Sequence, residues 1–360
     1  MNHREIKIQR LFSQQLVQPR YTSPVELVSY MVAMQAQDFP MAKWAVGVRI
    51  PGSTEKMVEA AITRAEILRL HVLRPTWHFV AAQDIYWMLD LTARWVMAGE
   101  TAREKQLELT KDVFSRSNAT LEKALAGGQS RTRNELIAAL QQAGIRTDEN
   151  RASHLFMRAE LDEIICSGAT QGGKATYALL SERVPLARRL IREAALAELA
   201  RRYFTSRYPA TQQDFSWWSG LPASEVKQAL ESVKQDFTTE VIDGVTYWLP
   251  RHVESVRATQ VNPILLPTYD ELLISYAERG ASFPAGIEQH MKDISNRGIF
   301  WPILLKDGQV VGTWMRTLKG DRVIIELSPF QPLAKAELDQ LQDAAQHYAN
   351  FLDKKLELIR

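Results

Sequence analysis

Two glutamines stand one residue apart in the string MQAQDFP (residues 34–40). Residues i and i+2 diverge by roughly 200° on an α-helix but share one side of an extended segment. The carboxamides of Gln35 and Gln37 can therefore converge only where a helix has ended, and Pro40 favours such an ending by disfavouring the helical conformation of Phe39. Each carboxamide would offer donor and acceptor groups to a water or a sugar. The alternative is a polar helix end with solvated amides.

A second string, HVLRPTWHFV (residues 71–80), is dense in large and ionisable residues at a predicted hairpin. Arg74 is a candidate for gripping a phosphate, and His78 for contacting nucleic acid or substrate. The alternative places Trp77 and Phe79 in a core, with Arg74 and His78 satisfied by local carbonyls or carboxylates.

Three weaker candidates follow along the chain. Lys174 in TQGGK, at a Gly-rich hairpin tip, is a candidate DNA contact. The alternative is a lysine that is simply exposed to solvent. Asp270 and Glu271 raise the idea of an acid/base pair or a Mg²⁺ site, but chain neighbours usually diverge, and a structural turn is the simpler interpretation. Trp217-Trp218 fits a core better than a base-stacking platform.

Cofactor motifs are missing from the sequence. It contains no GxGxxG, Walker A, HExxH or GxSxG string, so dinucleotide, NTP, zincin and α/β-hydrolase functions have no motif support. The 7 His are scattered, and no Cys/His cluster has the spacing of a zinc site. We expect neither a metal nor an organic cofactor.

Composition indicates an ordinary globular chain of several domains. It has 360 residues, 46% hydrophobic and 24% charged, with a net charge of +2. The one cysteine, Cys166, cannot form an internal disulfide, and the charged N-terminus lacks the apolar stretch of a signal peptide. We expect a cytoplasmic monomer with no membrane span. Because the net charge is small, any basic surface that binds nucleic acid must be confined to one part of the protein.

The order helix, helix, helix, hairpin recurs along the chain and is the plan of a winged helix. The clearest copy covers residues 118–180, with helices at 118–128, 131–144 and 150–165 and a hairpin tip at Gly172-Gly173. A second copy has a long helix over 186–204, a short segment over 211–220, a helix over 223–235 and a hairpin at Asp243-Gly244. A looser copy places helices at 4–16, 23–35 and 54–65 before strands at 66–73 and 77–81.

After about Val256 the pattern changes to short β-rich runs with turn signals, which indicates a small antiparallel sheet or barrel, followed by an amphipathic helix over 333–359. The predicted fold class is thus α+β: three tandem winged-helix units and a C-terminal antiparallel β-barrel with a terminal helix. The predicted domains are 1–117 (the first unit with connecting helices), 118–183, 184–254, and 255–360.

The strings QAQD (35–38), LRPTWHFV (73–80), LLPTYDE (265–271) and GTW (312–314) together resemble the AlkZ/YcaQ family of winged-helix DNA glycosylases. Singly, QAQ and GTW are weak, but the ordered set is specific and spans nearly the whole chain. The resemblance implies three tandem winged helices and a C-terminal β-barrel, in agreement with the repeat found from the pattern.

The resemblance also implies an activity. In that family a Gln-apolar-Gln or Gln-apolar-Asp motif carries catalysis, and Gln35 and Gln37 match the AlkZ branch. The implied reaction is hydrolysis of the N-glycosidic bond of N7-alkylated purines in double-stranded DNA, extending in some members to the unhooking of interstrand crosslinks. We expect a monofunctional glycosylase, with Asp38 capping the next segment and a shallow, open DNA groove.

Two other functions remain open from the residues alone. Winged helices most often read the major groove, so a non-catalytic DNA-binding regulator is the main alternative. A protein-interaction scaffold built from silent winged helices is another. Sequence-dependent affinity would favour the regulator, lesion-dependent affinity the glycosylase, and lack of a basic surface around Gln35 the scaffold.

Overall fold

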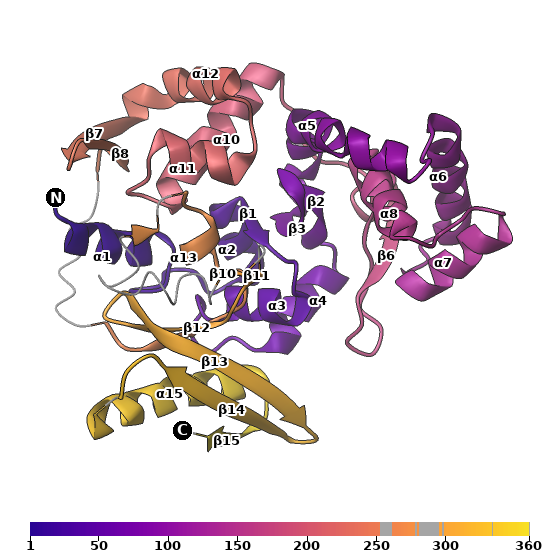
Figure 1. Ribbon diagram of the computed structural model, residues 1–360. Helices are drawn as coiled ribbons and strands as arrows, with labels where there is room; N and C mark the ends of the chain where they lie inside the picture. Colours follow the sequence, from indigo (N-terminus) through magenta and orange to yellow (C-terminus); the bar gives the residue numbers. More distant parts are fainter. Residues whose placement is uncertain (253–260, 278, 281–294, 297–298, 333, 360) are drawn as a thin grey trace.

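The structure is a computed structural model, and it describes residues 1–252, 261–277, 279–280, 295–296, 299–332 and 334–359. It mixes helices and β-sheets, which confirms the predicted α+β class (Figure 1). The N-terminal segment lies at the centre of the view, with residues 107–183 to its right, residues 192–250 above it and the C-terminal sheet below it.

The N-terminal segment builds a three-stranded antiparallel sheet in the order β1-β3-β2. The tight turn between β2 and β3 is made at Leu73, whose φ is 66°. The expected outline lacks one helix, α3, which begins directly after Asp38. The elements are α1 (His3–Ser13), α2 (Pro24–Met31), β1 (Ala33–Gln35), α3 (Phe39–Gly47), α4 (Glu55–Thr63), β2 (Ile67–Val72) and β3 (Arg74–Ala81).

A long helix, α5 (Ile85–Gln106), leads to a second group of helices and a hairpin. Gly172 and Gly173 turn this hairpin with φ values of 56° and 75°, which favour glycine. The boundary expected between residues 117 and 118 falls inside α6, because Thr110 caps that helix by accepting from the Val113 amide. The elements are α6 (Lys111–Leu125), β4 (Arg131–Thr132), α7 (Arg133–Gln142), α8 (Arg151–Leu161), β5 (Ile165–Ser167), β6 (Thr176–Leu179) and α9 (Leu180–Arg183).

A third group repeats the order. The helix expected from residue 186 begins only at Arg192, and Leu186 and Ile191 are exposed. Asp243 and Gly244 form the expected hairpin turn, both with positive φ. The elements are α10 (Arg192–Ser206), α11 (Gln212–Ser219), α12 (Ala223–Val233), β7 (Phe237–Ile242) and β8 (Val245–Pro250). The recurrence of helices and hairpin is therefore present, while the assignment of each group as a winged helix remains a prediction.

The C-terminal part is a five-stranded sheet in the order β15-β14-β13-β12-β9. Within the described residues this sheet is open, with β15 and β9 at its edges, so the predicted closed barrel is not found. The predicted boundary at 254/255 lies outside the described residues. The elements are β9 (Ile264–Leu266), α13 (Glu271–Ile274), β10 (Ser295–Asn296), β11 (Ile299–Phe300), β12 (Ile303–Lys306), β13 (Gln309–Lys319), β14 (Arg322–Pro329), α15 (Lys335–Phe351) and β15 (Lys355–Ile359).

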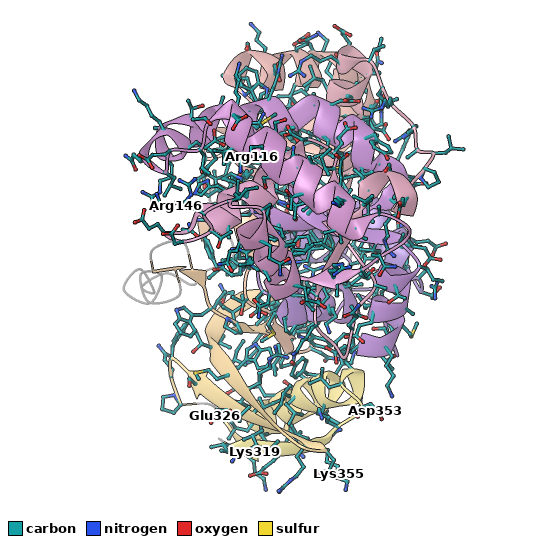
Figure 2. The ribbon with its side chains drawn as sticks, turned by 90° about the vertical axis from the view of Figure 1, so that its right-hand side faces the viewer. Arg116, Arg146, Lys319, Glu326, Asp353 and Lys355 are labelled. Atoms are coloured by element: carbon teal, nitrogen blue, oxygen red, sulfur yellow. The ribbon has the colours of Figure 1, made fainter. Side chains whose placement is uncertain are left out.

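The prediction of an all-antiparallel sheet ending in a helix was also wrong. The helix ends at Phe351, and Asp353, with φ 56°, turns the chain into β15. Because α15 carries the chain back along the sheet, β15 pairs with β14 in parallel. Leu356 and Leu358 alternate toward the core, while Lys319, Glu326, Asp353 and Lys355 project from this end of the molecule (Figure 2).

The hydrophobic cores do not follow the predicted domains. One core joins α2, α3 and α4 to the C-terminal sheet and α15, with Trp44 and Trp314 both buried in it. Another joins Ala33 and Val80 of the N-terminal sheet to α10, α11 and α12. The N-terminal sheet is thus packed from two sides by later parts of the chain.

Candidate active site

The two glutamines lie where the chain passes between two helices. Helix α2 ends at Met31, Val32 takes a positive φ of 64°, and β1 then pairs with β3 so that Gln35 lies opposite His78. The Ala36 amide still donates to the Trp77 carbonyl at 2.7 Å, so the pairing continues to Ala36, and the chain then bends at Gln37 before α3 begins. The glutamines thus lie beyond a helix, as their spacing requires, but the helix expected over 23–35 was too long, because it ends at Met31 and residues 33–35 form β1 instead.

The expected role of Pro40 was wrong. Pro40 lies in the first turn of α3, where proline is tolerated because amides there have no intrahelical partner. Asp38 is the N-cap of this helix and accepts from the Met41 amide at 3.2 Å, which confirms its expected role as a cap. What ends α2 is the reversal at Val32, eight residues before the proline.

Side chains of β1 alternate between two environments. Met34 enters the core shared with the C-terminal sheet, whereas Ala33 enters the core shared with α10, α11 and α12. By this alternation the Gln35 side chain lies on the Ala33 side of the sheet. Gln35 is 9% exposed and Gln37 is exposed to solvent.

The backbone of Gln35 is held from a distant part of the sequence. Its amide donates to Oε1 of Glu271 at 2.7 Å, across 236 positions in the chain. Oε2 of Glu271 accepts from Nη2 of Arg207 at 2.7 Å and from the Ser275 hydroxyl at 2.6 Å. Burial alone would raise the pKa of the Glu271 carboxyl, but the Arg207 charge and these hydrogen bonds hold that pKa below its usual value.

Arg207 also fixes the chain just before the motif. Its Nη1 and Nη2 donate to the carbonyls of Met31 and Ala33, each at 2.8 Å, and its side chain is fully buried. The guanidinium thus bridges the end of α2, strand β1 and Glu271. A planar fork with five donors suits such a multiple contact.

A second arginine contacts the carbonyls on the other side of the motif. Arg69 of β2 donates from Nε to the Ala36 carbonyl at 2.8 Å and from Nη2 to the Gln37 carbonyl at 3.4 Å. Its guanidinium also lies over the Trp77 ring, 4.6 Å from the centroid. Sequence reasoning missed Arg69, since a single arginine in a strand gives no signal for this role.

Arg74 is the predicted site residue that reaches the side chain of Gln35. Its Nη2 donates to Oε1 of Gln35 at 3.4 Å, and burial lowers the pKa of the guanidinium. Its guanidinium carbon is 5.9 Å from the centroid of the Trp217 ring, and that of Arg279 is 5.4 Å away on the same ring. Trp217 is 47% exposed, so a half-exposed indole lies next to the glutamine site.

The tryptophan pair divides between core and surface. Trp218 is fully buried, as expected for a core residue. Trp217 instead donates from Nε1 to the Ile274 carbonyl at 3.1 Å, which fixes its ring at the surface.

His78 lies beside Gln35 but is fully buried. Its Nδ1 donates to the Thr76 carbonyl at 2.8 Å. Burial, and then repulsion by Arg74, lower the pKa of the imidazole to about 3, so it is neutral near pH 7. This conformation gives His78 no exposed surface, and its contact with DNA stays a prediction.

Lys174 lies at the exposed tip of the β5–β6 hairpin, where it pairs with Gln171. The base of this hairpin contacts the N-terminal sheet, because the Ser167 hydroxyl accepts from the Arg69 amide at 2.8 Å. The hairpin therefore starts close to the glutamine segment. The contact of Lys174 with DNA stays a prediction.

Asp270 and Glu271 do not form an acid/base pair. Asp270 turns to Arg49, which donates to its two oxygens at 2.8 and 2.9 Å, while Glu271 turns to Arg207. Among the described residues no group of three or more His, Cys, Asp or Glu side chains is arranged to hold a metal. The interpretation of this string as a structural turn fits the geometry.

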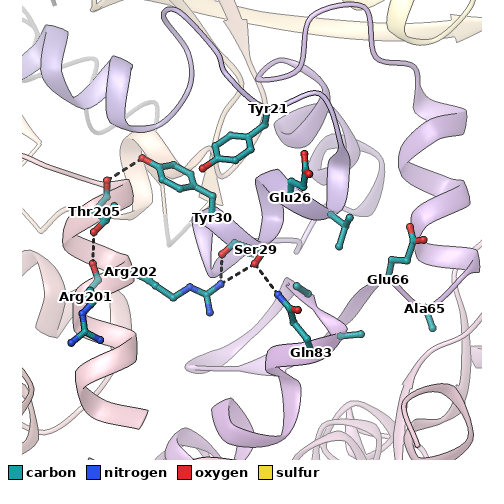
Figure 3. A pocket seen from close by; sticks show the side chains of 13 residues that line it. Tyr21, Glu26, Ser29, Tyr30, Ala65, Glu66, Gln83, Arg201, Arg202 and Thr205 are labelled. Carbon is teal, nitrogen blue, oxygen red and sulfur yellow. Dashed lines mark hydrogen bonds between the residues drawn. The ribbon is translucent and has the colours of Figure 1, made fainter. Parts of the chain in front are cut away.

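A pocket of about 880 Å³ opens between α2, α10 and the end of β3 (Figure 3). Neither Gln35 nor Gln37 lines it. Gln83 donates to the Ser29 hydroxyl at 3.1 Å, Arg202 also contacts Ser29, and the Tyr30 hydroxyl donates to the Thr205 carbonyl at 3.0 Å. These polar groups are thus engaged with one another. The expected open groove at Gln35 stays a prediction.

Comparison with known proteins gives consistent matches. The family described as DNA glycosylase AlkZ-like matches residues 28–351. The interstrand DNA cross-link repair glycosylase of Streptomyces sahachiroi is 21% identical over 366 residues, which cover 95% of this chain and 94% of that protein. The solved structure of the Streptomyces sahachiroi DNA glycosylase AlkZ has a similar fold, with a TM-score of 0.80 at 17% identity and full coverage of both chains. Among the described helices, none is both long and apolar enough to cross a membrane.

Proposed function

The chain belongs to the family of AlkZ-like DNA glycosylases, and on this premise we propose that it hydrolyses the N-glycosidic bond of N7-alkylated purines in double-stranded DNA. The observation that carries the proposal is the placement of Gln35 and Gln37. Gln35 ends strand β1 and Gln37 lies at the bend that follows it, and the backbone of this segment is held by Glu271 on one side and by Arg69 on the other. Such fixed dipoles are what electrostatic preorganisation requires.

The chemistry of the substrate explains why side-chain amides are sufficient for catalysis of base release. Alkylation at N7 gives the purine a positive charge, so the base leaves as a neutral molecule and needs no strong general acid. The surroundings agree with this requirement, because Asp38 is used as a helix cap, Glu271 is paired with Arg207, and His78 is held neutral. What remains is to stabilise an oxocarbenium-like sugar and to place a water on its far face.

Gln35 and Gln37 take these two tasks in the proposal. Their amides hold the water and contact the deoxyribose, and the water loses its proton late, because a neutral carboxamide is too weak a base to ionise it early. We place no Schiff-base lysine in this mechanism, so the product is an abasic site. Arg74 orients Gln35 through its amide oxygen, and Lys174 binds the DNA backbone.

Interstrand crosslinks joined through N7 follow the same chemistry, since each attached purine carries the same charge. A bulky or crosslinked base cannot enter a closed pocket, so this extension requires an open groove. The name of the Streptomyces sahachiroi relative supports including crosslinks among the substrates. We further propose that the protein acts as a monomer, which sedimentation of the protein with and without DNA would test.

The test is single-turnover release of 7-methylguanine from a duplex oligonucleotide at matched salt. Wild type is compared with Gln35→Ala, Gln37→Ala and the control Gln228→Ala, whose side chain is exposed on α12. We expect both motif variants to lose about 10²-fold or more in rate, as for loss of a preorganised dipole, while DNA binding persists. Absence of release by wild type, from 7-methylguanine and from bulkier N7 adducts, would favour a non-catalytic DNA-binding protein.

A further inference from the structure

The half-exposed indole of Trp217 lies beside the glutamine site and has no task in the mechanism proposed above. Trp217 is 47% exposed, whereas the adjacent Trp218 is fully buried. A single exposed apolar side chain is common in proteins and needs no explanation by itself. Trp217 differs from such a residue in two respects, which are its distance from Gln35 and the contacts that fix its ring.

One guanidinium separates the Trp217 ring from the Gln35 amide. Nη2 of Arg74 donates to Oε1 of Gln35 at 3.4 Å, and the guanidinium carbon of the same side chain lies 5.9 Å from the centroid of the Trp217 ring. Successive nucleotides of one DNA strand are about 3.4 Å apart along the helix axis. DNA whose sugar reaches Gln35 therefore brings a neighbouring nucleotide within reach of the indole.

Contacts on several sides fix the exposed ring in place. Nε1 of Trp217 donates to the Ile274 carbonyl at 3.1 Å. The guanidinium carbon of Arg279 lies 5.4 Å from the centroid of the Trp217 ring and 5.0 Å from that of the Phe300 ring. Nε of Arg279 in turn donates to the Leu273 carbonyl at 2.7 Å. A ring that is already ordered loses little conformational freedom when a ligand stacks on it, which favours binding.

A nucleobase is the part of DNA that matches an exposed indole. Aromatic side chains stack on bases of any sequence, because every base has a π-face. In an intact duplex, both faces of a base are covered by its neighbours. A base gains a free face when the nucleotide beside it is displaced or loses its own base, and excision of a base creates this situation. The indole therefore suits a base whose neighbour has been displaced or removed.

The charges around the ring indicate which base this is. Arg74 and Arg279 both lie against the Trp217 ring. Burial lowers the pKa of the Arg74 guanidinium, the Glu271 charge raises it, and the Arg279 charge lowers it. The Glu271 carboxylate is already paired with Arg207. An N7-alkylated purine is a cation and would be repelled by the two guanidiniums at the ring, so a neutral base suits this position better.

We propose that Trp217 stacks on a neutral base next to the alkylated purine, and that it covers the face which this base loses when the purine is displaced. Trp217 is a binding residue in this role and takes no part in bond cleavage. The choice of alkylated DNA as the ligand rests on the function proposed above. The tests use DNA from which the protein has no alkylated base to release, so they do not depend on glycosylase activity.

The first test measures stacking directly. A duplex carries a tetrahydrofuran abasic analogue, with the neutral fluorescent base 2-aminopurine placed in turn on either side of it in the same strand. Stacking on an indole quenches the fluorescence of 2-aminopurine. At saturating protein we expect the fluorescence in one placement to be about twofold or more lower with wild type than with Trp217→Leu, which lacks a ring. Equal fluorescence with the two proteins in both placements would overturn the proposal.

The second test measures affinity for the abasic duplex without 2-aminopurine. Trp217→Leu should bind this duplex about tenfold or more weakly than wild type, as for the loss of one stacked base, and should bind the undamaged duplex like wild type. Trp217→Phe, which keeps an aromatic ring, should recover most of the loss. Met315→Ala is the matched control, because Met315 on β13 is 55% exposed, and it should bind both duplexes like wild type.

The abasic duplex also decides against the other base that Trp217 could contact. If Trp217 stacked on the alkylated purine itself, Trp217→Leu would bind the abasic duplex as tightly as wild type, and the proposal would be refuted. If wild type released no base from alkylated DNA, the proposed glycosylase would fail. The fluorescence of 2-aminopurine would still decide whether Trp217 stacks on a neighbouring base.

Discussion

The hairpins of the first and second helical groups follow similar helices but end in opposite surroundings. The β2–β3 turn is buried, with Leu73 only 2% exposed, and it is packed so closely under α11 that a Cβ on Gly220 would lie 3.0 Å from the Leu73 carbonyl oxygen. The β5–β6 hairpin instead ends in Gly172, Gly173 and Lys174, all exposed. One hairpin is a scaffold for the glutamines, and the other presents a tip to solvent.

This difference shows that a hairpin after three helices does not by itself identify a DNA-reading wing. The first hairpin is covered by a later part of the chain at Gly220, which lies against Leu73, and its Arg74 donates to the side chain of Gln35. The second group has a core of its own, built from α6, α7, α8, β5 and β6, and its hairpin tip remains available to a partner. Three predictions test this contrast.

The largest effect is expected from Glu271→Ala. Removing this carboxylate leaves the buried Arg207 charge unpaired, and breaking such a pair costs about 3–5 kcal/mol in the free energy of unfolding. Urea unfolding measures this loss. Glu231→Ala, which breaks an exposed pair with Lys234, should cost no more than about 1 kcal/mol. Equal losses in the two variants would show that the glutamine segment beside the first hairpin is not held through Glu271.

An intermediate effect concerns the pH dependence of stability. The pKa of His78 is about 3 in the folded protein, against about 6.5 when unfolded. As pH falls from 6.5 toward 3, the unfolded chain binds a proton that the folded chain does not. Stability from His78 is therefore complete above pH 6.5 and is lost below it, by up to about 1.4 kcal/mol per pH unit.

The measurement is the unfolding free energy at pH 7 and pH 5 for wild type and His78→Gln, whose side chain does not titrate. The variant should lose less stability between these two values, because all other titrating groups are common to both proteins. His252→Gln, at an exposed position, should behave like wild type. If His78→Gln had the same pH dependence as wild type, the His78 imidazole would be in contact with solvent, and the first hairpin would be as exposed as the tip of the second.

The smallest effect is expected from Lys174→Ala at the exposed tip. Loss of one phosphate contact should weaken DNA binding several-fold and lower the slope of log K against log salt by about 1. The single-turnover rate at saturating enzyme should not change, since Lys174 is not part of the glutamine site. Lys227→Ala, exposed on α12, is the control. If Lys174→Ala left affinity and salt slope unchanged, the tip would have no role in DNA binding.

Local features of this protein were determined by its sequence alone. The turns at Gly172-Gly173 and Asp243-Gly244 and the helix cap at Asp38 all follow from the preferences of neighbouring residues. The repeated order of helices and hairpin could also be predicted from the sequence, because hydrophobic periodicity is read over short windows.

The tertiary structure decided which distant residues meet. The residues around Gln35 do not indicate that Glu271 accepts from the Gln35 amide. Nor do they indicate that Arg207 donates both to Glu271 and to the Met31 carbonyl at the end of α2. The parallel β15 and the burial of His78 were equally undetermined, since both depend on packing between segments far apart in the chain. Composition and spacing set the local conformation, whereas burial sets the charge state and contacts of each site residue, and burial exists only once the whole chain has folded.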